Sequence, residues 1–195
     1  MNATGKRIAI FVEDMYEDQE FWYPYFRLLE AGAKVTVVGT TKKEFKSKHG
    51  YPAAADVGID DVSAAAFDGV IIPGGYAPDK MRRYPKLLEF VREIDRAGKL
   101  VATICHGGWV LCSTKTLRGR TVTGVSAIKD DLTNAGATYV DAEVVRDGHL
   151  ITSRTPKDLP AFLRTILQTL AESPGDGKAR GGNAGKPKSA SAGSR

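Results

Sequence analysis

The chain has 195 residues, and its hydrophobic share of 42% and charged share of 26% are typical of one globular domain. No apolar run approaches the roughly 18 residues of a membrane span. The run at residues 8–12 is also shorter than the apolar region of a secretion signal, so we expect a cytoplasmic protein that binds no membrane. The net charge is +5, but residues 173–195 carry +4 of it. The nearly neutral remainder argues against a nucleic-acid-binding face and leaves only weak binding through the basic end.

Apolar runs alternate with amphipathic segments along the chain, a pattern typical of a mostly parallel sheet covered by helices. Apolar spacing and glycine stops predict, in chain order, a strand at 8–12, a helix at 19–31, strands at 35–38 and 70–72, a helix at 86–97 and a strand at 100–104. We then expect a helix at 107–114, a strand at 121–123, a helix at 130–135, a hairpin of 143–145 with 150–152, and a helix at 156–170.

The last 23 residues differ from the rest, because Gly, Ser, Ala, Lys and Pro dominate residues 173–195 and no large apolar side chain occurs there. Such a segment cannot bury enough surface to offset the entropy of ordering it. We therefore expect one α/β domain at residues 1–172 and a disordered basic tail at residues 173–195.

The two cysteines, Cys105 and Cys112, lie seven residues apart in a segment that reads as helix. Two helical turns separate them by ~10 Å, more than the ~7 Å that a disulfide can bridge between Cα atoms. We expect two reduced thiols with separate roles, and we interpret Cys112, on an apolar helix face, as a packing residue.

The clearest chemical signal lies where the buried strand at 100–104 runs into Cys105 and His106-Gly107-Gly108 opens a helix. This is the layout of a nucleophile elbow, in which a sharp turn presents one side chain above the strand ends. The N–H groups and dipole at the helix start should lower the pKa of the thiol. A cysteine that only packs would not need the residues that follow, so we interpret Cys105 as a nucleophile. His106 could orient the thiolate, transfer a proton or contribute only its backbone N–H.

Two other segments follow strands that should end at the same sheet edge, where open parallel sheets bind ligands. Pro73-Gly74-Gly75 follows the strand at 70–72, and the N–H of Gly75 could form an oxyanion hole with that of His106. The loop after the first strand is acidic, and one of its carboxyls could act on the thiol as a general acid or base. Composition does not choose among its acids, which are Glu13, Asp14, Glu17, Asp18 and Glu20.

The three histidines and two cysteines show no metal-ligand spacing, so the sequence predicts no metal site and no cofactor. Gly74-Gly75 also lacks the Lys-Ser/Thr pair of a phosphate-binding loop. We interpret His49 as a structural residue and His149 as a surface turn residue.

Six separated motifs occur in an order that resembles the ThiJ/PfpI family of the class I glutamine-amidotransferase-like superfamily, especially its PfpI-like intracellular-protease branch. The resemblance covers about residues 6–171. Its motifs are Tyr16-Glu17-Asp18 through Tyr23-Pro24, Lys48-His49-Gly50-Tyr51, Pro73-Gly74-Gly75 with Ala77-Pro78, Ile104-Cys105-His106-Gly107, Ile128-Lys129-Asp130-Asp131 with Asn134-Ala135-Gly136, and Val140-Asp141-Ala142-Glu143-Val144-Val145.

The resemblance implies a flavodoxin-like sandwich, with helices on both faces of the sheet, that assembles as a homodimer or hexamer. It implies Cys105 as the nucleophile, His106 beside it, and Glu17 as the acid whose carboxyl hydrogen-bonds the thiol. In the protease branch a glutamate after the Pro-Gly-Gly turn reaches the neighbouring subunit's histidine to complete a triad. Asp79 occupies that position here and is one methylene shorter, which favours chemistry that needs no triad.

Two activities are implied by the resemblance: attack on reactive aldehydes such as methylglyoxal and their glycated adducts, of the deglycase or glyoxalase III type, and peptide hydrolysis. The first needs only a thiolate, a proton-shuttling acid and an oxyanion site. We therefore expect a cofactor-independent cysteine enzyme of stress protection that acts on a small aldehyde, a protein or a peptide, with an intracellular cysteine peptidase as the alternative. A different class is a non-catalytic redox sensor, in which Cys105 is oxidised to sulfenic or sulfinic acid.

Overall fold

The structure, a computed structural model, describes residues 2–172, so the tail predicted at 173–195 lies outside the described residues. Its main sheet is built from β1 (Arg7–Val12), β2 (Lys34–Gly39), β5 (Val57–Gly58), β6 (Gly69–Ile72), β7 (Leu100–Ile104), β10 (Val144–Asp147) and β11 (Leu150–Ser153). The strand order is β10-β11-β7-β6-β1-β2-β5. Every neighbouring pair is parallel except β10 with β11, which form the predicted hairpin. The expected mostly parallel α/β sheet is confirmed.

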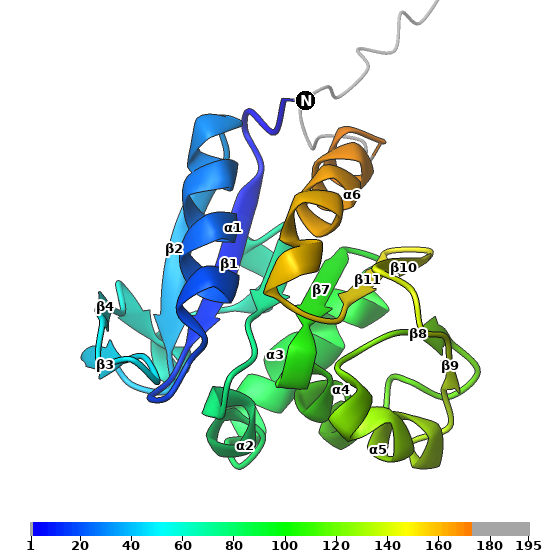
Figure 1. Ribbon diagram of the computed structural model, residues 1–195. Coiled ribbons are helices and arrows are strands. Elements are labelled where there is room, and N and C mark those ends of the chain that lie inside the picture. The colour runs from blue at the N-terminus through cyan, green and yellow to red at the C-terminus, as the bar shows by residue number, and fades with distance from the viewer. Residues whose placement is uncertain (1, 173–195) are drawn as a thin grey trace, which may run out of the picture.

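Helices cover both faces of this sheet (Figure 1). On one face α1 (Asp18–Glu30) lies beside α6 (Leu159–Glu172), and on the other α3 (Pro85–Arg96) packs against β6 and β7. Three short helices, α2 (Ala77–Met81), α4 (Gly108–Thr114) and α5 (Lys129–Asn134), gather near the carboxyl ends of the central strands. Within the described part of the chain, no helix is both long and apolar enough to cross a membrane.

Four short strands form two small sheets apart from the main one. Strand β3 (Glu44–Lys46) pairs antiparallel with β4 (Pro52–Ala54), and β8 (Thr121–Val122) pairs parallel with β9 (Thr138–Tyr139). The strand predicted at 121–123 is therefore present but does not belong to the main sheet. Sequence periodicity missed the other three strands and α2, because segments of two to five residues are too short to show a repeat.

The central strands place the site. All residues of β6 and β7 are buried, and so are five of the six in β1, which explains their continuous apolar sequences. These three adjacent strands run in parallel, so their carboxyl ends reach the same edge of the sheet. The acidic loop, the Pro-Gly-Gly turn and Cys105 follow these ends and are therefore brought together.

Candidate active site

Cys105 lies at a sharp turn directly after β7. Its backbone φ is +58°, in the left-handed region that side chains other than glycine rarely adopt. A short 3-10 turn, Cys105–Gly107, then leads into α4. A Cβ on Gly107 would lie 2.1 Å from Thr103 Oγ1, so only glycine fits beside the strand at that point. The predicted nucleophile elbow is present, with Cys105 at its apex.

Two backbone N–H groups, those of His106 and Gly75, lie close enough to the Cys105 sulfur to favour its thiolate form. Gly75 reaches this position with φ +78°, and a Cβ on it would lie 2.5 Å from the carbonyl oxygen of Met15. The same loop is fixed by Tyr76 N–H, which donates to Met15 O at 2.9 Å. Gly75 must therefore be glycine, because the Pro-Gly-Gly turn passes against the loop that contains Met15 at this point. Its N–H lies with that of His106 beside the Cys105 sulfur, where the sequence suggested an oxyanion hole.

The carboxyl that faces Cys105 belongs to Glu20, which is fully buried. Its Oε2 accepts a hydrogen bond from Gly74 N–H at 2.8 Å. A Cβ on Gly74 would lie 2.6 Å from that oxygen and 2.8 Å from Cys105 Cβ, so the missing side chain is what lets acid and thiol approach. Oε1 is also buried and has no hydrogen-bond partner of ordinary geometry among residues 2–172. Glu20 thus has one anchored oxygen and one oxygen available to the thiol proton.

Burial controls the protonation of this pair. Burial, together with a smaller effect of the nearby Glu17 charge, raises the pKa of Glu20 to about 7, against the hydrogen bond from Gly74. Burial and the charge of Glu20 raise the pKa of Cys105 to about 12, although the N–H groups of His106 and Gly75 favour the thiolate. The lowered thiol pKa expected from the helix start is therefore wrong, because desolvation outweighs the backbone N–H groups.

Glu17, the acid implied by the family resemblance, does not make this contact. It precedes the first residue of α1 in extended conformation, and its carboxylate forms an ion pair with Lys48. The ammonium of Lys48 also lies close enough to Glu20 and Cys105 for both to raise its pKa. The difference has a geometric cause: Glu20 lies one turn before Pro24 and two before Leu28 on the buried face of α1, whereas Glu17 precedes the helix and pairs with Lys48. A glutamate at an apolar-face position was the sequence signal for it.

His106 lies beside the thiol, with Nδ1 3.3 Å from Cys105 Sγ. Burial lowers the pKa of this imidazole, which keeps it neutral at physiological pH. Asp79 is not brought to His106 within the described chain; it lies on α2 and pairs with Arg83 one turn later. The structure thus unites Cys105, His106, the Gly75 N–H and Glu20, and leaves Asp79 and Glu17 with other partners.

The remaining histidines and the second cysteine have structural contacts. His49 Nδ1 lies 2.6 Å from Asp18 Oδ2. His149 lies in the turn between β10 and β11 and is partly exposed, as expected, and its Nε2 lies 2.8 Å from Asp95 Oδ1. Both cysteines are free thiols, and burial raises the pKa of Cys112 to about 11.

One group of possible metal ligands could not be seen from sequence spacing. Glu17, Asp18 and His49 bring ligand atoms within 4.8 Å of one another. These side chains already bond within the protein, Glu17 to Lys48 and Asp18 to both Ser47 and His49. We therefore treat the group as a hydrogen-bonded cluster.

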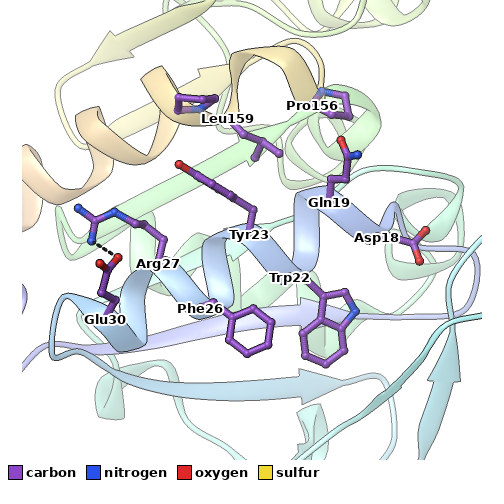
Figure 2. A pocket seen from close by; sticks show the side chains of 10 residues that line it. Asp18, Gln19, Trp22, Tyr23, Phe26, Arg27, Glu30, Pro156 and Leu159 are labelled. Atoms are coloured by element: carbon purple, nitrogen blue, oxygen red, sulfur yellow. Dashed lines mark ion pairs between the residues drawn. The ribbon is translucent and has the colours of Figure 1, made fainter.

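A separate apolar hollow of about 740 Å³ lies along the outer side of α1 and the start of α6 (Figure 2). Figure 2 shows Trp22, Tyr23 and Phe26 on the α1 side, with Pro156 and Leu159 opposite. Cys105 does not line it. This apolar hollow is therefore not the site of the cysteine chemistry.

Sequence comparisons identify the family of this chain. The DJ-1/PfpI family model matches residues 6–169. The chain belongs to the DJ-1/PfpI family. "Protein/nucleic acid deglycase 2" of Escherichia coli is 42% identical over 169 residues, 85% of this chain and 98% of that protein. "Putative cysteine protease YraA" of Bacillus subtilis is 43% identical over 167 residues, 85% of this chain and 99% of that protein.

Solved structures give the same result for the fold. A crystal structure of a two-domain protein from Anabaena variabilis, with DJ-1/ThiJ/PfpI-like and ferritin-like domains, is 46% identical with a TM-score of 0.83. The match covers 85% of this chain and 50% of that one. The flavodoxin-like family fold expected from the sequence is confirmed.

Proposed function

We propose that this member of the DJ-1/PfpI family is a cysteine-dependent deglycase that converts methylglyoxal, free or bound as an early adduct on proteins, to lactate. The observation that carries the proposal is the buried Cys105–Glu20 pair beneath the N–H groups of Gly75 and His106. The reaction uses only these side chains, these backbone groups and water. Two free thiols fit a reducing compartment, which supports the cytoplasm as its place of action.

The reaction starts when the Cys105 thiol and the Glu20 carboxyl together hold one proton instead of two. The Cys105 thiolate adds to the aldehyde carbon, and the new alkoxide takes the proton from Glu20, giving a hemithioacetal. During this step the N–H groups of Gly75 and His106 stabilise the developing oxyanion. The Glu20 carboxylate then removes the proton from the first carbon and returns it to the second, while the hydroxyl proton on the first carbon passes to the oxygen of the second, giving a lactoyl thioester. Water hydrolyses the thioester to lactate, one proton and the free thiol, so methylglyoxal and water become lactic acid.

A protein adduct enters the same sequence after one earlier step. In the early adduct, the aldehyde carbon carries a hydroxyl and the nitrogen or sulfur of the modified side chain. That bond breaks as the nitrogen or sulfur gains a proton and the hydroxyl loses one. The aldehyde passes to the thiolate, and the side chain is restored.

A cysteine peptidase is the second candidate, favoured by the 3.3 Å contact between His106 Nδ1 and Cys105 Sγ. A neutral imidazole there could accept the thiol proton, as in other cysteine–histidine enzymes. Within one chain, however, the carboxylate next to Cys105 is Glu20, and Asp79 bonds to Arg83 instead of orienting His106. This arrangement fits proton transfer between neighbouring carbons better than a triad.

The test is lactate release from methylglyoxal and from methylglyoxal-treated N-acetylated arginine, lysine and cysteine. We expect turnover by the wild type, none by Cys105→Ser, and nearly unchanged turnover by the matched control Cys112→Ser. A fluorogenic peptide and a peroxide treatment followed by mass spectrometry run in parallel. Peptide cleavage without lactate would establish the peptidase, and sulfinic acid on Cys105 without either product would establish the redox sensor.

We also propose that α1 supplies the contact of the expected homo-oligomer. Phe26 is 60% exposed and Tyr51 59%. Trp22 is stacked on Phe26 with ring centroids 5.5 Å apart and meets Tyr51 edge-on at 5.6 Å. Together with the apolar hollow of Figure 2, these rings form a patch suited to a second copy of the chain. Light scattering should show that Phe26→Asp lowers the oligomer mass; an unchanged mass would place the contact elsewhere.

A further inference from the structure

A row of aromatic rings runs alongside the nucleophile. Tyr76 comes directly after Gly75, His106 directly after Cys105, and Trp109 one helical turn after His106. The Tyr76 and His106 rings are stacked with centroids 6.5 Å apart, and His106 and Trp109 lie 4.9 Å apart. We call Tyr76, His106 and Trp109 the aromatic row. Its middle ring is the one that contacts the Cys105 sulfur, so the row lies within reach of a group carried on an aldehyde bound to that sulfur.

One end of the aromatic row already holds a guanidinium. The Arg82 guanidinium carbon lies 6.0 Å from the Trp109 ring centroid, and Arg82 Nε donates to Ser113 Oγ at 2.9 Å. Trp109 Nε1 donates to Asp131 Oδ2 at 2.9 Å, which places a carboxylate beside the same end. The row thus offers electron-rich faces of a kind that attract planar cations, and Asp131 offsets the charge of Arg82.

The other end of the row is open to solvent. Tyr76 is 61% exposed although it is tied to the site through its own backbone hydrogen bond to Met15. An aromatic ring next to the site that has most of its surface in water is not explained by packing. Its free face is where the carrier of an aldehyde adduct would emerge from Cys105.

We propose that the aromatic row selects the substrate: it binds the planar guanidino group of arginine adducts, with Tyr76 as the specificity-determining ring. The inference rests on the proposed deglycase function. Lysine and cysteine adducts carry no planar cation and gain less from the rings, and free methylglyoxal does not reach Tyr76. Selection for arginine-borne adducts is therefore a property of binding and belongs in KM rather than kcat.

The experiment compares Tyr76→Leu, Tyr76→Phe and the control Tyr84→Leu, which alters another exposed tyrosine. For the methylglyoxal adduct of N-acetylarginine, Tyr76→Leu should lower kcat/KM about three- to five-fold through KM, as expected for an exposed cation–π contact. Tyr76→Phe should restore most of the loss, and turnover of free methylglyoxal and the lysine adduct should change less than about twofold. Equal losses on all substrates, or a larger loss on a guanosine adduct, would overturn the proposal.

A second measurement separates this proposal from the proposed function. N-acetylarginine amide should protect Cys105 from iodoacetamide better than N-acetyllysine amide does, and Tyr76→Leu should remove that difference. Protection that depends on Tyr76 without any lactate would refute the deglycase function and leave the aromatic row as a binding site. Lactate formation with neither protection nor selectivity depending on Tyr76 would refute the aromatic row alone.

Discussion

The two faces of helix α1 have opposite relations to water and serve different purposes. The inner face buries Glu20, Phe21, Pro24 and Leu28, so a carboxyl shares the apolar stripe and reaches Cys105. The outer face exposes Phe26 at 60% and Leu29 at 42%. Glu20 is a charged residue, which an amphipathic pattern would place in solvent, but it is buried. Phe26 and Leu29 are apolar residues, which the same pattern would place in the core, but they are exposed. Under the functions proposed above, these departures from amphipathicity correspond to chemistry on one face of the helix and to a contact surface on the other.

The inner face keeps its carboxyl because burial is useful there. A solvated glutamate titrates near 4.5 and would be an anion throughout the physiological range, unable to donate a proton. Burial brings the pKa of Glu20 to about 7, where it can both give and take a proton. Glu17, only three residues earlier, pairs with Lys48 instead of facing Cys105.

The largest expected effect contrasts these two glutamates. Glu20→Gln keeps the shape of the side chain and an oxygen for Gly74 N–H, but it cannot transfer a proton. We expect lactate formation to fall ~10²–10⁴-fold, as when a general acid–base is removed. Glu17→Gln removes an ion pair with the partly exposed Lys48, and we expect it to lower the rate of lactate formation less than about tenfold. Steady-state kinetics on methylglyoxal measures both, and a greater loss in Glu17→Gln would return the shuttle role to Glu17.

The next effect concerns two phenylalanines on opposite faces of α1. Phe21 is fully buried, so Phe21→Ala should lower the free energy of unfolding by about 3–5 kcal/mol. Phe26→Ala removes an exposed ring and should change it by about 0.5 kcal/mol or less in dilute protein. Urea denaturation at several protein concentrations measures both. A Phe26→Ala cost that grows with concentration supports the contact surface, and a large cost that does not would show that Phe26 packs within the monomer.

Much of the fold could be predicted from the sequence because long segments carry periodic patterns. The buried strands, the three long helices and the Asp147-Gly148 hairpin all follow from local spacing. The short elements β3, β4, β5, β9 and α2 could not be found this way, because their boundaries are set by the loops they pack against. Cys105 and the Pro-Gly-Gly turn were found because a strand ending in small residues is a local signal.

The choice of acid could not be made from local signals alone. Glu17 and Glu20 lie in one acidic stretch, and which of them reaches Cys105 depends on where α1 begins and how it rotates against the sheet. The approach also needs Gly74, whose missing Cβ makes room between Glu20 and Cys105. The raised pKa of the thiol has the same origin, because burial by surrounding elements outweighs the local helix start.

The smallest expected effect is a pH dependence of stability that comes from the buried carboxyl itself. The pKa of Glu20 is about 7 in the folded protein, against 4.5 as its reference value, so the folded state binds this proton more tightly than the unfolded state. Its contribution is therefore fully present below about pH 4.5, declines as the pH rises towards 7, and stays lost above that. The total decline is at most about 3 kcal/mol.

Glu20→Gln should lack this decline, so the variant should gain stability relative to the wild type between about pH 5 and 7, reaching about 1–3 kcal/mol at pH 8. The lowered pKa values of His106, Asp18 and Asp68 also make stability pH-dependent, but these groups are present in both proteins and largely cancel in the difference. Urea unfolding of both proteins from pH 5 to 8 measures that difference. In the wild type, Cys105 alkylation should rise through the same range, because the pair becomes reactive when it loses its first proton near pH 7. A flat stability difference would mean that Glu20 is ionised throughout and cannot shuttle a proton.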